Sequence, residues 1–125
     1  MKHPHSMLSQ AAIGLLLLAG PTLALAQDPA VVNPNNVRVT LENDRVRVLE
    51  AILRPGDKEQ PHSHPACIMH ILAGGRIRAH TVGGPTSEVE VATGETVYRE
   101  PVTHWAENIG TTTIRLIVVE LKDPR

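Results

Sequence analysis

Three histidines are the residues of this sequence best suited to chemistry. One residue separates His62 from His64, and His104 lies further along the chain. On an extended segment, side chains two residues apart project from the same side, with α-carbons about 6–7 Å apart. A neutral imidazole donates a nitrogen lone pair to Zn²⁺ or a similar ion at roughly 2.0–2.1 Å. The pattern predicts that His62 and His64 bind one divalent transition metal ion, with His104 as the candidate third ligand.

Two further side chains are candidates for a fourth ligand. His70 lies on an apolar segment, 66–73, and on a regular strand it points away from the face that carries Cys67 and Met69. Its access to the site would require a β-bulge. Cys67 can ligate as a thiolate, although a single cysteine on an apolar strand more often behaves as a small buried hydrophobe.

The segments that must position these histidines have the patterns of short β-strands. Residues 37–42 alternate between apolar and polar, and residues 45–53 begin with the same alternation and end almost entirely apolar. Further strands are expected over 66–73, 76–82, 87–92, 95–99, 104–108 and 111–121, and no stretch has convincing helical periodicity. Short strands separated by Gly, Pro and Asn turns predict an all-β sandwich or closed barrel.

Two glycine-rich segments predict tight hairpins. Gly74 and Gly75 follow an apolar run and precede an alternating one, which is a strong signal for a two-residue hairpin turn. A second hairpin centred near Gly84 is expected to place two acidic side chains across from two basic ones: Glu88 and Glu90 opposite Arg76 and Arg78.

The first 26 residues have the pattern of a secretion signal. Lys2 provides a basic start, residues 11–19 form an apolar run, and small residues follow up to Ala26. We expect cleavage after Ala26 and a periplasmic or secreted protein. A membrane-spanning helix needs about 20 apolar residues. No other segment is that long, so we expect no membrane association after cleavage.

The rest of the chain is sufficient for one domain. Residues 27–36 are rich in Pro and Asn and predict an extended arm, and residues 37–125 are expected to form the barrel. Because the chain has a single cysteine, an internal disulfide is excluded. Runs that are apolar on both strand faces suggest a homodimer.

Composition argues against nucleic acid as a partner. The chain has 12 basic and 13 acidic residues, no basic run, and only Tyr98 and Trp105 as aromatic residues. Phosphate neutralisation and base stacking therefore lack the side chains that perform them.

Together with nearby glycines, the histidines match two sequence motifs of a known family. Four residues fit the first motif of the cupin family: Gly56, His62, His64 and either Gly74 or Gly75. The second motif is matched by Gly94, His104 and Asn108, with Pro101 displaced by one and Thr103 in place of a glycine. The sequence thus resembles a small single-domain cupin. It departs from that family at the glutamate of the first motif, where the candidate positions hold Cys67, Ile68 and Met69.

This resemblance implies a double-stranded β-helix, or jelly-roll barrel, with a metal ion inside held by His62, His64 and His104. It implies Fe²⁺ first, with Mn²⁺, Ni²⁺ or Zn²⁺ as alternatives. Three neutral imidazoles leave the charge of a divalent ion unbalanced, which suits a small anionic or enolic ligand.

Three functional hypotheses follow. The first is a mononuclear, dioxygenase-like metalloenzyme, for which no catalytic residue stands out. The second is a non-catalytic module that binds a small molecule or a metal, since a fold does not fix a function. The third is a barrel without metal, whose histidines only pack and form hydrogen bonds.

Overall fold

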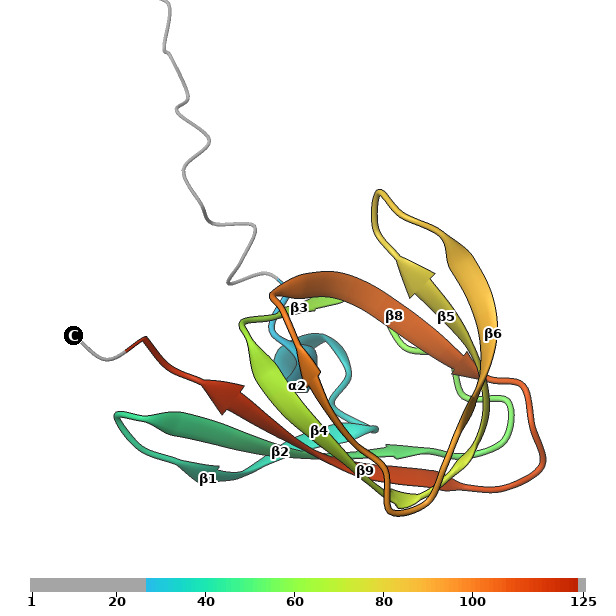
Figure 1. Ribbon diagram of the computed structural model, residues 1–125, viewed down its shortest axis with the longest axis horizontal. Coiled ribbons are helices and arrows are strands. Elements are labelled where there is room, and N and C mark those ends of the chain that lie inside the picture. The colour runs from blue at the N-terminus through green and yellow to red at the C-terminus, as the bar shows by residue number, and fades with distance from the viewer. Residues whose placement is uncertain (1–26, 124–125) are drawn as a thin grey trace, which may run out of the picture.

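The computed structural model describes residues 27–123 as two facing antiparallel β-sheets with one short helix (Figure 1). The expected signal peptide, residues 1–26, lies outside the described residues. The elements follow in this order: α2 (Pro29–Val32), β1 (Val37–Glu42), β2 (Val46–Leu53), β3 (His62–His64), β4 (Cys67–Ala73), β5 (Gly75–Thr81), β6 (Thr86–Val91), β7 (Thr96–Arg99), β8 (Val102–Asn108) and β9 (Ile114–Leu121).

The strands divide into two sheets that mix segments distant in sequence. The five-stranded sheet has the order β1-β2-β9-β4-β7, and the four-stranded sheet has the order β3-β8-β5-β6. Figure 1 shows the first sheet as the lower layer and the second as the upper layer. The expected all-β jelly-roll architecture is confirmed.

The hydrophobic core lies on the inner face of the five-stranded sheet. Alternation along the central strands points every second side chain inward, as the sequence pattern predicts. These inward side chains form one buried cluster of Val37, Leu49, Ala51, Cys67, Met69 and Val118. The opposite face of the same sheet carries exposed apolar side chains, among them Ile68, Leu72 and Tyr98.

The prediction of a hairpin at Gly74 and Gly75 is wrong. β4 pairs with β7 and β9, whereas β5 pairs with β6 and β8, so the two glycines carry the chain from one sheet to the other. Neither glycine has a positive φ. Instead, a Cβ on Gly74 would collide with the carbonyl oxygen of Val91, and one on Gly75 would lie 2.7 Å from the Thr112 hydroxyl. Glycine is needed at both positions because neighbouring parts of the chain approach the backbone too closely for a side chain.

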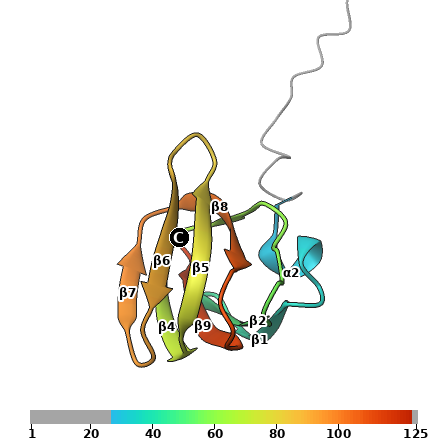
Figure 2. The same cartoon turned by 90° about the vertical axis from the view of Figure 1, so that its right-hand side faces the viewer.

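The second expected hairpin is confirmed in register. β5 and β6 pair with Arg76 opposite Glu90 and Arg78 opposite Glu88. The Arg76 guanidinium lies 2.8 Å from the Glu88 carboxylate, a diagonal contact between the strands. Figure 2 shows the turn of this hairpin extending beyond the rest of the barrel.

The N-terminal arm contains a helical turn where an extended segment was expected. The Asp28 side chain accepts a hydrogen bond from the Ala30 N–H at 2.9 Å, and Pro29 occupies the start of α2. An N-cap aspartate followed by proline is a helix-start signal that outweighs the local asparagines. α2 is only one turn long, and residues 27–123 contain no helix long and apolar enough to cross a membrane.

Asn108, at the end of β8, connects the two sheets. Its side-chain amide donates to the Leu53 carbonyl at 2.9 Å and to the Thr112 carbonyl at 2.8 Å. Its Oδ1 accepts from the Gly110 N–H at 3.0 Å. Because Asn108 is buried and fully hydrogen-bonded, it holds the strand that carries His104 against β2.

Candidate metal centre

Strand pairing brings the three candidate histidines together. β3 pairs with β8 so that His62 lies directly opposite His104, and His64 lies one same-face step further along β3. His62 is 2% exposed and His64 is 6% exposed. The ring centroids are 4.8–5.2 Å apart, and one nitrogen from each ring lies within 4.8 Å of the others. Such a group can hold one metal ion.

The backbone beside His62 fixes which of its nitrogens is free. Nδ1 of His62 lies 2.8 Å from the Gln60 carbonyl oxygen, which can only accept, and 3.2 Å from the amide nitrogen of Asn33, which can only donate. The shorter contact assigns the proton to Nδ1, because the Asn33 amide can donate to the Gln60 carbonyl instead. The side chain of Asn33 holds Gln60 in place: Oδ1 accepts from its N–H at 2.7 Å, and Nδ2 donates to its carbonyl at 3.2 Å. Nε2 of His62 therefore offers its lone pair to the centre.

A buried carboxylate holds Nδ1 of His64 and leaves its Nε2 free. Nδ1 of His64 lies 2.7 Å from Oε2 of Glu120, and both side chains are buried. Glu120 is in turn 3.4 Å from the Arg47 guanidinium, which is 2.9 Å from the carboxylate of Asp28. A carboxylate on the outer nitrogen orients a ligating imidazole and raises its basicity. The residues present thus fit a bound metal ion.

Burial keeps two of these imidazoles uncharged. Desolvation lowers the pKa of His62 to about 4, with a smaller opposing contribution from the Gln60 carbonyl. Desolvation, followed by the nearby His62 and His64, lowers the pKa of His104 to about 3. At neutral pH both rings are therefore neutral, which is the state that donates a lone pair to a metal.

Neither candidate for a fourth ligand joins this group. Cys67 is fully buried in the hydrophobic core cluster, and burial, together with Glu120, raises the pKa of its thiol. His70 points to the other face of β4, where its Nδ1 lies 2.7 Å from the Thr96 hydroxyl. Among residues 27–123, the ligand atoms that converge within 4.8 Å come from His62, His64 and His104.

A carboxyl group that the sequence analysis did not consider lies beside the histidines. Glu59 is 7% exposed; its Oε1 accepts from the Ala106 N–H at 3.1 Å, and its Oε2 lies 3.9 Å from Nε2 of His62. Desolvation raises the pKa of Glu59 to about 7, against the opposing effect of the Ala106 N–H. Its only sequence signal was its position three residues before His62.

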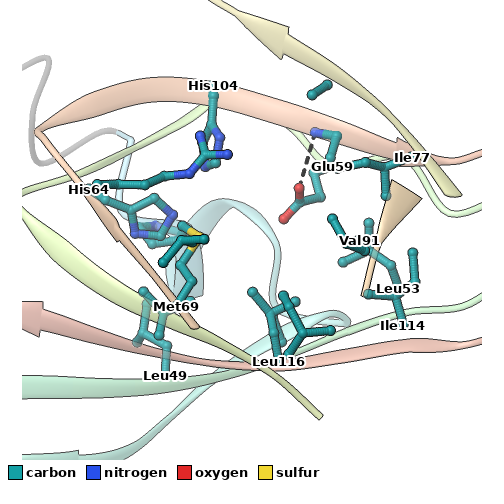
Figure 3. Close-up of a pocket in the computed structure, with 18 of the residues that line it drawn as sticks. Leu49, Leu53, Glu59, His64, Met69, Ile77, Val91, His104, Ile114 and Leu116 are labelled. Atoms are coloured by element: carbon teal, nitrogen blue, oxygen red, sulfur yellow. Dashed lines mark hydrogen bonds between the residues drawn. The ribbon is translucent and has the colours of Figure 1, made fainter. Parts of the chain in front are cut away.

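The histidines and Glu59 face one cavity of about 190 Å³ between the sheets. Figure 3 shows His64 and His104 at one end, the Glu59 carboxyl directed into the space, and Leu53, Val91 and Ile114 at the other end. The remaining lining is mostly aliphatic, apart from Glu90, Glu95 and Arg99. A pocket of this kind suits a ligand with one polar end and an apolar body.

A jelly-roll barrel with histidines converging on an internal cavity defines the cupin class of proteins. Residues 49–120 match the model of the cupin domain family, Cupin_2, and this chain belongs to that family. No curated protein sequence matches the chain.

Solved structures share the fold. A cupin domain protein from Bordetella pertussis Tohama I is 25% identical, with a TM-score of 0.64 over 70% of this chain and 92% of its own. An RmlC-like cupin from Methanocaldococcus jannaschii is 17% identical, with a TM-score of 0.58 over 69% and 78%. The polyketide cyclase RemF from Streptomyces resistomycificus is 22% identical, with a TM-score of 0.52 over 70% and 64%.

Proposed function

We propose that this cupin binds one divalent transition metal ion through His62, His64 and His104 and acts on a small anionic or enolic compound in a dioxygenase-like reaction. The observation that supports this most strongly is the pair of Nδ1 contacts, from His62 to the Gln60 carbonyl at 2.8 Å and from His64 to the Glu120 carboxylate at 2.7 Å. Both Nε2 atoms are thereby free for the same ion.

The metal, when bound, supplies Lewis-acid or one-electron redox chemistry at open coordination positions. Around it, the chain's own groups have separate tasks. The three imidazoles would hold the ion, and the aliphatic lining would exclude water from the ligand. Glu59 is the group able to move a proton, because its pKa of about 7 lets Oε2 accept or release one near neutral pH.

Metal content tests the first half of this proposal. The purified wild-type protein is expected to retain roughly one ion of Fe²⁺, Mn²⁺, Ni²⁺ or Zn²⁺ per chain. His62→Ala should lose that ion, since it removes a ligand nitrogen. The matched control is His70→Ala, which removes a histidine bonded to Thr96 on the outer face. Equal metal content in both variants, or none in the wild type, would contradict the proposed centre.

Oxygen uptake over a panel of enolic and carboxylate compounds tests the second half. We expect turnover with the Fe²⁺-loaded protein and a loss of at least about tenfold in Glu59→Gln, which cannot exchange a proton. Glu100→Gln, an exposed carboxylate outside the cavity, is the control. Stoichiometric ligand binding without turnover would replace the enzyme hypothesis with a non-catalytic binding module.

Export and self-association stay predictions of the proposal. Cleavage after Ala26 would leave a periplasmic or secreted protein that begins at Gln27, which intact-mass measurement of the exported fraction checks. The apolar outer face of the five-stranded sheet, with Ile68, Leu72 and Tyr98, supports pairing with a second copy. Light scattering of the purified protein should then give twice the mass of one chain.

A further inference from the structure

One arginine that lines the cavity has no partner among residues 27–123. Arg99 is the last residue of β7, an edge strand in which Val97 and Arg99 line the cavity while Tyr98 between them is exposed on the outside. Arg99 pairs in register with Cys67, and its own side chain is exposed. Alternation along β7 therefore directs the Arg99 side chain to the cavity side of the strand.

The ion pairing of the other arginines makes Arg99 unusual. Within residues 27–123, six arginines lie within 4.0 Å of a carboxylate: Arg38, Arg47, Arg54, Arg76, Arg78 and Arg115. Over the same residues, Arg99 and Arg45 have no side-chain ion pair or hydrogen bond. Arg45 belongs to the turn between β1 and β2, outside the cavity.

The acidic groups that share the cavity are already engaged. The Glu59 carboxyl accepts from the Ala106 N–H at 3.1 Å, and the Glu95 carboxyl accepts from the Ala92 N–H at 3.3 Å. Glu90 lies 3.8 Å from the Arg76 guanidinium. None of the three contacts Arg99 within ion-pairing distance in the part of the chain that the structure describes. The guanidinium is thus available to a ligand.

Arg99 also shares its cavity with the candidate metal ligands. Arg99 and His104 both line the same cavity, whose far end is aliphatic. A ligand that reaches from the histidines to the aliphatic end therefore lies in the same cavity as Arg99.

We propose that Arg99 binds the carboxylate of a small monocarboxylate ligand whose apolar body fills the aliphatic end of the cavity. This rests on the proposed function, since it specifies the anionic compound that the same site takes. The planar guanidinium presents paired N–H donors that match the two oxygens of a carboxylate. A ligand with one negative charge is favoured over one with two, because only one unpaired arginine lines the cavity and three glutamates line it too.

The size and lining of the cavity limit the rest of the ligand. Its volume of about 190 Å³ is somewhat larger than the ~150 Å³ of an apolar cavity that accepts benzene. The aliphatic end is formed by Leu53, Ile71, Val91, Ile114 and Leu116. A ring or a short aliphatic chain bearing one carboxylate fits both the volume and the lining.

Calorimetric titration with benzoate and hexanoate, each compared with its neutral amide, tests this assignment. We expect the wild-type protein, zinc-loaded, to bind at least one of the two acids at least about tenfold more tightly than its amide. Arg99→Gln should remove that preference by weakening the acid at least about tenfold. Arg99→Lys should restore part of it, and Arg45→Gln, the matched exposed arginine, should bind like the wild type.

Two results would overturn the assignment. One is binding of the acid to Arg99→Gln within about twofold of the wild type, and the other is the absence of acid binding to the wild type at millimolar concentrations. Metal analysis of the same samples keeps the proposals separate. Arg99→Gln should retain full zinc, whereas a failed metal centre would show as low zinc in the wild type. Arg99-dependent acid binding would still be measurable in that metal-free protein.

Discussion

Nδ1 of His64 lies 2.7 Å from Oε2 of Glu120, and this buried contact joins β3 of one sheet to β9 of the other. The carboxylate accepts a hydrogen bond from the Nδ1–H of His64 and so directs Nε2 toward the other two histidines. Glu120, on the five-stranded sheet, thus orients the imidazole of His64, which belongs to the four-stranded sheet.

The first prediction concerns this orienting carboxylate. Glu120→Gln keeps the shape of the side chain but loses its charge, so His64 becomes a weaker and less firmly oriented donor. We expect metal affinity to fall about tenfold, at the lower end of such effects. Competition with a chromophoric chelator measures it, and Glu100→Gln, an exposed residue, serves as the control. Unchanged affinity in Glu120→Gln would show that His64 needs no orienting partner.

The second prediction concerns the N-terminal arm. Asn33 is buried and bonds both backbone groups of Gln60, whose carbonyl fixes the proton of His62. Asn33→Ala should weaken metal binding roughly 10-fold to 100-fold, because the backbone that sets His62 becomes free to move. Asn35→Ala, at an exposed position of the same arm, should leave the affinity unchanged. The same loss in both variants would point to general loosening of the arm.

The third prediction is that the effect of Glu59 on the free energy of unfolding depends on pH. The folded-state pKa of Glu59, about 7, lies above its ordinary value of 4.5, so the folded protein binds more protons between these pH values. Stability from this group is therefore present below pH 4.5 and is lost as pH rises through about 7.

Glu59→Gln removes the charge but keeps an acceptor for the Ala106 N–H. The metal-free variant should match the wild type near pH 4.5 and exceed its stability above pH 7 by about 1–3 kcal/mol. Urea unfolding at the two pH values measures this difference. The contributions of His62 and His104 are common to both proteins and cancel. A variant less stable than the wild type at high pH would refute the raised pKa.

The fourth prediction concerns the crossover between the sheets. In Gly74→Ala, the added methyl group would meet the backbone of Val91 and Thr93, which cannot yield without moving β6. We expect a loss of at least about 2 kcal/mol in the free energy of unfolding. Gly84→Ala is the control, since the nearest atoms to its Cβ are Thr81 side-chain carbons at 3.2 Å. Equal stability of the two variants would remove the close-approach explanation.

Much of the fold could be predicted because strand periodicity is local. Alternation in residues 37–42 and 45–53 reflects burial on one sheet face, and the Arg–Glu pattern fixed the register of β5 and β6. The hairpin prediction at Gly74 and Gly75 was wrong because glycine serves both tight turns and close backbone approach. Only the positions of β6 and β9 distinguish these uses.

The sequence by itself determined the His-x-His pair, whose spacing places both rings on one side of an extended segment, since this depends only on neighbours along the chain. The tertiary structure decided the rest of the site. It set His104 opposite His62, directed Glu59 and Arg99 into the same cavity, and left His70 on the outer face. These placements depend on which strands pair and on how the two sheets face each other, and no local spacing encodes them.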